Sequence, residues 1–366
     1  MNAGPAFPTA LLQQSSAEKL KYFKGITVPH RHLQTALDHL LLDLQEPADI
    51  SILFIVGPTG VGKTTLRLRA ENLLLEKYLP ELQANPGQVA VASMEVAAAE
   101  QSKFSHRDYY IRALEAIGDV MADYKFSYGI QHQADPIHHS KNSAAQRRAL
   151  ENVLRLRQVK TFMVDEAHHL LMTAGAHQML QQMTWIKSLA NISGTTHALF
   201  GTYELLNCSK LSGQLSRRSA DIHLSRYQSD IEQDVTEFIR VIHTFQRHFP
   251  LAHKSQLEKH YDYLMDYSIG CIGILKTWLM RALRSALLEE SNSLKMKYLK
   301  QSEYSAARRQ QLHEEAQAGE RRFQDNGLSS TNIAAPGMTT KPNSKHGRVG
   351  KRNPKRDPTG GGSSAR

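Results

Sequence analysis

The stretch Ile55–Leu66, IVGPTGVGKTTL, constrains the fold of this chain more than any other feature. It contains the complete pattern G-x-x-x-x-G-K-[ST], with Gly57, Gly62, Lys63 and Thr64 at the defined positions. Glycines at this spacing let the backbone wrap around an anion, so that successive N–H groups point at phosphate oxygens. The positive end of the following helix dipole adds to this attraction. The sequence therefore predicts a P-loop that binds a nucleotide.

The residues on both sides of this loop have the patterns that a P-loop requires. Ile52–Val56 is a continuous apolar run, typical of a strand buried on both faces. Thr64–Tyr78 has the apolar spacing of an amphipathic helix, which we expect to stop before Pro80 because proline disrupts a helix interior. A strand, a glycine loop and a helix in this order make the match specific.

The motif gives the residues of the loop separate roles. Lys63 is expected to reach the β- and γ-phosphates of ATP, and the Thr64 hydroxyl to ligate Mg²⁺. The residues expected to contact the nucleotide are Gly57, Pro58, Thr59, Gly60, Val61, Gly62, Lys63, Thr64 and Thr65.

A second motif, FMVDEAHHLL, supplies the carboxylates that hydrolysis needs. Asp165 ends an apolar run, where it is placed to hold the Mg²⁺ shell, and Glu166 follows, where it can orient or deprotonate the attacking water. Together with the P-loop, this acidic pair predicts an ATPase. The letters DEAH also suggest a helicase, but such helicases need a second RecA-like core, and the pattern after Asp230 is helical and short.

The rest of the chain divides into an α/β part and an all-helical part. Further strands are expected at Val89–Val96, Val159–Val164, His197–Phe200 and Ala220–Leu224, with helices at Tyr109–Tyr124, Ala144–Arg157 and Ala176–Leu189. Lys125–Lys141 is polar and reads as a loop. After Asp230 the apolar residues keep helical spacing without intervening strands, over Ile231–Phe249, Ser255–Tyr267 and Gly270–Leu288.

Charge and cysteine content restrict the partners and the compartment. The net charge of the 366 residues is +10, but eight basic residues and one acid lie between Thr331 and Arg366. Most of the excess therefore belongs to a Gly-, Ser- and Pro-rich end, for which we predict a disordered basic tail. Two cysteines and no apolar run of about 18 residues argue for a cytoplasmic protein without a membrane span.

Eighteen histidines include the adjacent pairs His138-His139 and His168-His169. Neither an HExxH pattern nor a cysteine partner accompanies them, and adjacent side chains are expected to point in different directions. We therefore expect structural or solvated histidines rather than metal ligands.

Several stretches together resemble one known family, the transposition AAA+ ATPases of the TniB/TnsC group, relatives of the MuB-type target-selection ATPases. The stretches are ITVPHR at residues 26–31, GPTGVGKTTL, MVDEAHHL, ALFGTYEL, QLSRRSADIHLSRY and YSIGCIGILKTWLMRAL, and the resemblance covers Gly25–Glu290. It implies an α/β, AAA+ P-loop NTPase core with a parallel sheet flanked by helices, followed by a small all-helical lid domain and a disordered basic C-terminal tail. The expected divisions are an N-terminal arm (1–30), the core (31–230), the lid (231–325) and the tail (326–366).

The resemblance also implies partners and further site residues. Such proteins assemble as rings or filaments on duplex DNA, mark the target and recruit transposase subunits, with a target-selector protein or RNA-guided complex choosing the site. ATP favours the assembly and hydrolysis disperses it. Thr202 matches the residue that senses the γ-phosphate, and Arg217, with Arg218 as the alternate, matches the arginine finger that acts on a neighbour's ATP. Lys103 and Arg107 are the nearest matches to residues that contact DNA phosphates.

One departure from the family concerns the lid. Related lids carry an arginine just after the second glycine of GxxG, whereas this chain has Gly273-Ile274-Leu275, with Lys276 next. The contact by which the lid senses the nucleotide is therefore expected to be weaker in this chain, to be moved to Lys276, or to be absent. Two other classes of ATPase stay open: the secretion-linked ExeA type, which usually carries a membrane span or wall-binding module, and replication initiators, which usually carry a winged helix after the lid.

Overall fold

A parallel five-stranded sheet forms the centre of the α/β part in this computed structural model, in the order β2-β3-β4-β1-β5. The structure describes residues 6–45, 49–98, 104–118, 143–171, 176–209 and 217–331. The strands are β1 (Ile52–Val56), β2 (Val91–Glu95), β3 (Thr161–Asp165), β4 (Thr196–Gly201) and β5 (Ser219–His223). All five predicted strands are thus present, and every pair of neighbours is parallel.

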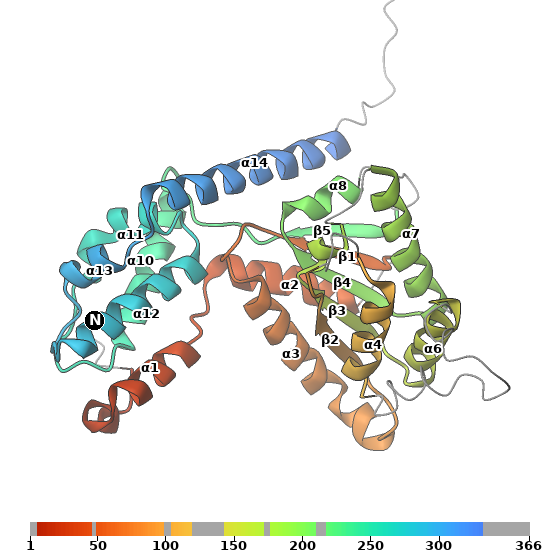
Figure 1. The fold of residues 1–366 in the computed structure, drawn as a ribbon, viewed down its shortest axis with the longest axis horizontal. Helices are drawn as coiled ribbons and strands as arrows, with labels where there is room; N and C mark the ends of the chain where they lie inside the picture. Colours follow the sequence, from red (N-terminus) through yellow and green to blue (C-terminus); the bar gives the residue numbers. More distant parts are fainter. Residues whose placement is uncertain are drawn as a thin grey trace, which may run out of the picture.

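Helices cover both faces of the sheet (Figure 1). Successive side chains of a strand point to opposite faces, and in β1 Phe54 belongs to one apolar cluster while Leu53 and Ile55 belong to the other. The helices on the Phe54 face are α4 (His106–Ala116), α6 (Ser143–Leu156) and α7 (Ala176–Ser193), and those on the other face are α2 (Arg31–Gln45) and α3 (Lys63–Ala84). Burial from both sides explains why the strands read as continuous apolar runs.

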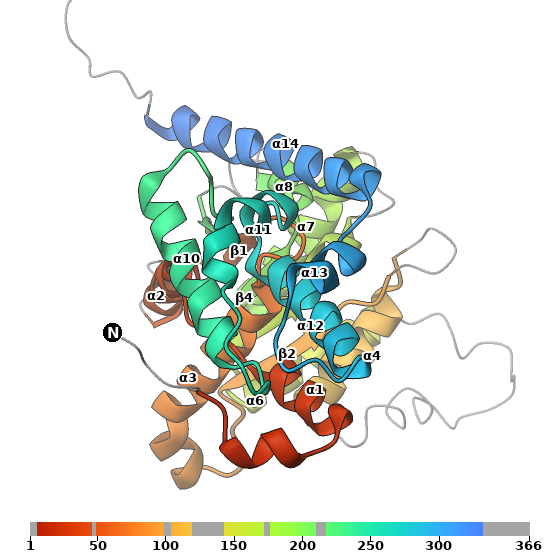
Figure 2. The same ribbon diagram turned by 90° about the vertical axis from the view of Figure 1, so that its left-hand side faces the viewer.

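A bundle of helices with its own apolar core lies beside the α/β part. Its helices are α10 (Glu232–Arg247), α11 (Tyr261–Tyr267), α12 (Ile272–Leu288) and α13 (Met296–Ser302). The N-terminal helix α1 (Ser16–Gly25) packs against α12 and buries Phe23 completely in this core. Figure 2 shows α1 at the lower edge of the bundle and the long helix α14 (Ala306–Thr331) across its top.

One expectation from the sequence is wrong. Helix α3 does not stop before Pro80 but continues to Ala84. Pro80 and Glu76, whose carbonyl loses its helical hydrogen bond to the proline, are both exposed, so water can satisfy that carbonyl. The sequence also gave no indication of α14, which covers the first residues assigned to the tail. The predicted loop Lys125–Lys141 and the chain from residue 332 lie outside the described residues.

Among the described residues, no helix has both the length and the apolar character that crossing a membrane requires.

Buried histidines make the stability of this fold depend on pH. Burial lowers the pKa of His30, His197 and His223 to about 4, so all three are neutral in the folded protein at pH 7. Their pKa in the unfolded chain is about 6.5, so acid protonates the unfolded state first. We expect the free energy of unfolding to be highest above pH 6.5 and to fall towards pH 4, by on the order of 3 kcal/mol per histidine. Urea unfolding at several pH values measures this.

The His197→Asn variant should show a shallower fall over the same window, because one of the three groups no longer titrates. A free energy of unfolding that stays constant or rises between pH 6.5 and pH 4 would contradict the prediction.

Candidate nucleotide-binding site

The P-loop connects the carboxyl end of β1 to the first turn of α3. Gly60 and Gly62 have φ values of +76° and +117°, in the left-handed region that favours glycine. A side chain at Gly57 would place its Cβ 2.3 Å from the carbonyl oxygen of Leu224, so this position also requires glycine. The loop therefore has the wrapped backbone that the motif predicts.

Lys63 lies across this loop. Its ammonium group is buried and donates hydrogen bonds of 3.0 Å to the carbonyl oxygens of Gly57 and Pro58. Burial lowers the pKa of Lys63, while the nearby carboxylates of Glu166 and Asp165 oppose this shift. Phosphate oxygens would give the ammonium group a charged partner in place of two neutral carbonyls.

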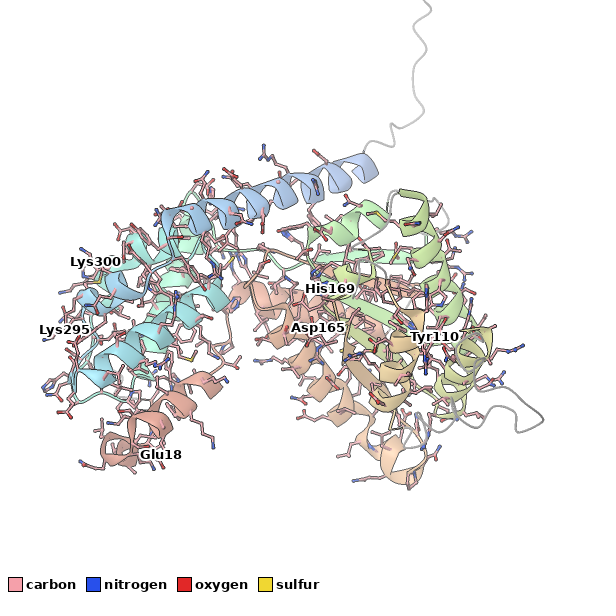
Figure 3. The ribbon with its side chains drawn as sticks, in the orientation of Figure 1. Glu18, Tyr110, Asp165, His169, Lys295 and Lys300 are labelled. Carbon is pink, nitrogen blue, oxygen red and sulfur yellow. The ribbon has the colours of Figure 1, made fainter. Side chains whose placement is uncertain are left out.

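Asp165 ends β3 and Glu166 follows it. Figure 3 shows Asp165 near His169. Asp165 is almost completely buried, and its Oδ1 accepts a hydrogen bond of 3.0 Å from the backbone N–H of Glu166. Glu166 has a φ of +50°, which costs a residue other than glycine about 1–3 kcal/mol. Such strain is typical of functional sites, and its side chain is partly exposed. This combination suits a fixed metal-binding carboxylate and an accessible base.

Arg67 is a site residue that the sequence reasoning missed. Its Nε donates to Oδ2 of Asp165 at 3.2 Å, and its Nη1 donates to Glu71 at 2.9 Å and to Ser93 at 2.7 Å. The guanidinium group therefore fixes the Asp165 carboxylate against α3 and β2. Its position four residues after Lys63, on the same helical face, is the signal that could have identified it.

The expected Mg²⁺ ligands fit the ion by their chemistry. The Thr64 hydroxyl and the Asp165 carboxylate offer oxygen donors, which Mg²⁺ prefers. When bound, Mg²⁺ would neutralise charge on the phosphate oxygens.

The histidines that follow differ from the expectation that adjacent rings diverge. The rings of His168 and His169 have centroids 4.3 Å apart, and one ligand atom from each lies with Glu166 inside a group no more than 4.8 Å across. The shared neighbour is the Glu166 carboxylate, 3.3 Å from Nδ1 of His168, which draws the polar edges of both rings to one side. Burial lowers the pKa of His168.

Thr202 follows β4, the strand next to β1, and reaches the P-loop. Its Oγ1 is buried, and no group in the described part of the chain hydrogen-bonds to it. Thr202, Pro58 and Thr59 line one pocket of ≈ 300 Å³. A buried hydroxyl without a partner requires an explanation, and a terminal phosphate at the P-loop would satisfy it.

The lid approaches the other side of the P-loop. The backbone N–H of Gly273, in the first turn of α12, donates a hydrogen bond of 2.9 Å to the carbonyl oxygen of Gly60. A small pocket beside this contact has a mixed lining, with apolar side chains from three segments: Ile26 and Val28 of the N-terminal arm, Val61 of the P-loop and Ile272 of the lid. Polar residues, among them Lys276, complete the lining. Its position and lining suit the base of a nucleotide.

Lys276 is directed to the N-terminal arm. Its ammonium group donates a hydrogen bond of 2.8 Å to the carbonyl oxygen of Lys24. Lys276 lines the pocket on the base side, and it is not among the residues that line the pocket of Thr202.

The other predicted residues are not brought to the P-loop. Arg217 and Arg218 are exposed immediately before β5, whose first residue pairs with the first residue of β1. They therefore lie at the end of the sheet opposite to the P-loop, where Arg218 donates to Asn191 at 3.2 Å. Arg107 is exposed at the start of α4, and Lys103 lies outside the described residues.

Comparison with known proteins agrees with this geometry. Residues 48–208, which include β1 to β4, match a family model described as an AAA domain. The chain has the fold of an AAA+ ATPase. Nucleotide binding and hydrolysis are the general activities that this match supports. Among curated proteins, none matches the sequence.

Two solved structures share the fold. The ORC1 protein of Aeropyrum pernix, solved in complex with DNA, is 14% identical, with a TM-score of 0.53 over 79% of this chain and 68% of its own. The ORC2 protein of the same organism, solved as ADPNP and ADP complexes, is 14% identical, with a TM-score of 0.50 over 78% and 72%. At this identity the similarity concerns the fold alone.

Two substitutions separate nucleotide binding from hydrolysis. Lys63→Ala removes the buried cation, so we expect loss of ATP binding. Glu166→Gln keeps the side-chain volume but not the base, so we expect ATP binding with hydrolysis slowed by about 10²–10⁴. Calorimetry and phosphate release measure the two steps, and Lys77→Ala, further along α3, is the control. Wild-type hydrolysis by Glu166→Gln would contradict the assignment.

The lid contact has its own test. A Cβ at Gly273 would lie 2.5 Å from the carbonyl oxygen of Gly60, whereas a Cβ at Gly25 would meet nothing within 4 Å. Gly273→Ala should therefore push the lid away from the P-loop, lowering the free energy of unfolding by about 1–3 kcal/mol and weakening nucleotide binding. Gly25→Ala should change neither, and equal behaviour of the two variants would show that the contact is unimportant.

Proposed function

We propose that this AAA+ ATPase is an ATP-dependent DNA-binding regulator of transposition. In this function the protein oligomerises on target duplex DNA, marks the site and recruits or activates the transposase, and hydrolysis of ATP controls disassembly. The motif resemblance to the TniB/TnsC group supports the biological role. The position of the arginine pair supports the assembly.

The arginine pair is the single observation that carries the assembly. Arg217 and Arg218 are exposed and are separated from their own P-loop by the length of β5. Five residues of a strand span about 16 Å, more than an arginine side chain reaches. An arginine finger at this position acts only on the ATP of a second copy, so a complete site requires an oligomer.

DNA contacts in such an assembly would be made to phosphates. Arg107 is exposed at the start of α4, and Lys103 precedes it in the sequence. Contacts of this kind position a protein without reading bases, so binding is salt-dependent and tolerant of sequence. The basic chain end from Thr331 to Arg366 would add to the same attraction.

A second candidate is an initiator-like function in replication. The observation in its favour is the fold, which is shared over most of this chain with the DNA-bound ORC1 protein of Aeropyrum pernix. The two candidates differ in partners: a transposition regulator binds a transposase subunit in an ATP-dependent manner, and an initiator binds origin DNA and a replicative helicase.

Electron microscopy with duplex DNA tests the assembly. We expect rings or filaments on DNA with ATP, and none with ADP or with Lys63→Ala in ATP. Arg217→Ala and Arg218→Ala should still bind ATP, but the one that removes the finger should slow hydrolysis in the DNA-bound assembly by about 10³-fold or more.

Two outcomes would count against the proposal. A protein that stays monomeric and indifferent to DNA in every nucleotide state would exclude the target-marking function. If the DNA-bound assemblies of both arginine variants hydrolyse ATP at the wild-type rate, neither arginine is a finger.

A further inference from the structure

Helix α14 links the lid to the phosphate side of the nucleotide site. It starts at the helical bundle and runs across to the α/β part, as Figure 1 shows. There it packs on Tyr203, the residue after the sensor Thr202. A Cβ at Gly319 would lie 1.9 Å from the Tyr203 ring, so the helix approaches as closely as only glycine permits.

Two further contacts fasten α14 in this place. Glu320 accepts two hydrogen bonds from the guanidinium group of Arg226, at 2.8 and 3.0 Å, and both side chains are largely buried. Phe323 stacks on the ring of His223 with centroids 4.4 Å apart, and the same imidazole lies 2.8 Å from the Tyr203 hydroxyl. Bidentate pairing and ring stacking restrain both the position and the rotation of the helix.

Helix α14 contributes Arg322 to the pocket that Thr202 lines. This pocket of ≈ 300 Å³ is lined by Pro58 and Thr59 of the P-loop, by Thr202 and by α14. Arg322 is the one basic side chain among its described lining residues, and in the described part of the chain no group forms a hydrogen bond or ion pair with its guanidinium. A free cation and a buried hydroxyl without a partner thus border one pocket at the P-loop.

Two acidic residues also border the pocket. Glu204 and Glu315 also line it, and Glu315 accepts a hydrogen bond from Gln311 on its own helix. Carboxylates repel phosphate, so an anion in this pocket needs a cation beside them. Arg322 is placed to supply that charge.

The lid proper provides no cation on this side. Ile274 occupies the place after the second lid glycine and lies against Gly60, where a Cβ would be 2.7 Å from its side chain. The next basic residue, Lys276, is bound to the carbonyl of Lys24 on the base side. Among the described residues that line the pocket of Thr202, the helical part of the chain therefore contributes a cation only through α14.

We propose that Arg322 binds the terminal phosphate of ATP within its own subunit, so that α14 distinguishes ATP from ADP. This inference rests on the ATP site of the proposed function but not on DNA or on oligomerisation. Arginine suits the task because its planar group donates two parallel hydrogen bonds to a phosphate.

Nucleotide affinities without DNA test the proposal. Mant-ATP and mant-ADP would be titrated into the chain of 366 residues carrying Glu166→Gln, which slows hydrolysis. Arg322→Gln should weaken mant-ATP binding about tenfold or more, as expected when charge-assisted hydrogen bonds to the phosphate are lost, and leave mant-ADP binding unchanged. Arg322→Lys should lose less affinity for mant-ATP than Arg322→Gln, because lysine keeps the positive charge.

The neighbouring Arg321 is the matched control. Its Nε donates to the carbonyl oxygen of Gln317 on its own helix, and it is not among the residues that line the pocket. Arg321→Gln should therefore bind both nucleotides as tightly as the protein that carries Glu166→Gln alone. Its melting temperature should equal that of Arg322→Gln.

Three results would overturn the inference. They are equal weakening of mant-ATP and mant-ADP in Arg322→Gln, no weakening of either, and the same loss in Arg321→Gln. Because the titration contains no DNA, failure of the parent to assemble on DNA would count against the proposed function and leave this result standing.

Discussion

All five strands of the sheet run in the same direction, and the site depends on this constraint. Parallel strands present their carboxyl ends at one edge, so the P-loop after β1, Asp165 at the end of β3 and Thr202 after β4 meet there although they are distant in the sequence. Nucleotide sites of open α/β sheets lie at this edge for the same reason. The apolar strands, buried by helices on both faces, make the edge rigid enough to hold a buried lysine and a strained glutamate in place.

The helical part of the chain touches this edge on two sides. On the base side, the backbone of Gly273 is bonded to Gly60, and the N-terminal arm completes the pocket. On the phosphate side, α14 packs on Tyr203 and is held by the pair of Arg226 and Glu320. Because the two contacts belong to one chain of connected helices, a nucleotide bound between them would fix the orientation of the helical part relative to the sheet.

The sequence predicted the parts of the site that depend on local patterns. The loop Gly57–Thr65 needs glycines at fixed spacing, and β1 and β3 are short apolar runs, so neighbouring residues suffice to identify them. Pro80 was misjudged because the cost of a proline depends on whether the freed carbonyl meets water, which spacing does not show. The contact of Gly60 with Gly273 joins residues far apart in the chain, so no local pattern predicts it.

Helix α14 shows the same limit more clearly. Its sequence is mostly polar, and its described buried positions are Ala316, Gly319 and Glu320. Ala316 and Gly319 face the apolar core and Tyr203, and the partly buried Phe323 stacks on His223. They recur at helical spacing, but a stripe of alanine, glycine and one phenylalanine is too weak to distinguish from a solvated helix. Such a helix gains its stability from tertiary contacts rather than from its own residues, so Arg322 could be connected with the P-loop only once the fold was known.

The two edges of the sheet restrict how copies of this chain can assemble. The P-loop lies at the carboxyl edge, whereas Arg217 and Arg218 lie at the amino edge beside the start of β1. Under the proposed function, the arginine surface of one copy faces the P-loop surface of another, which a head-to-tail interface provides. Interfaces of this kind close into a ring when the rotation between subunits allows it and otherwise continue as a helical filament.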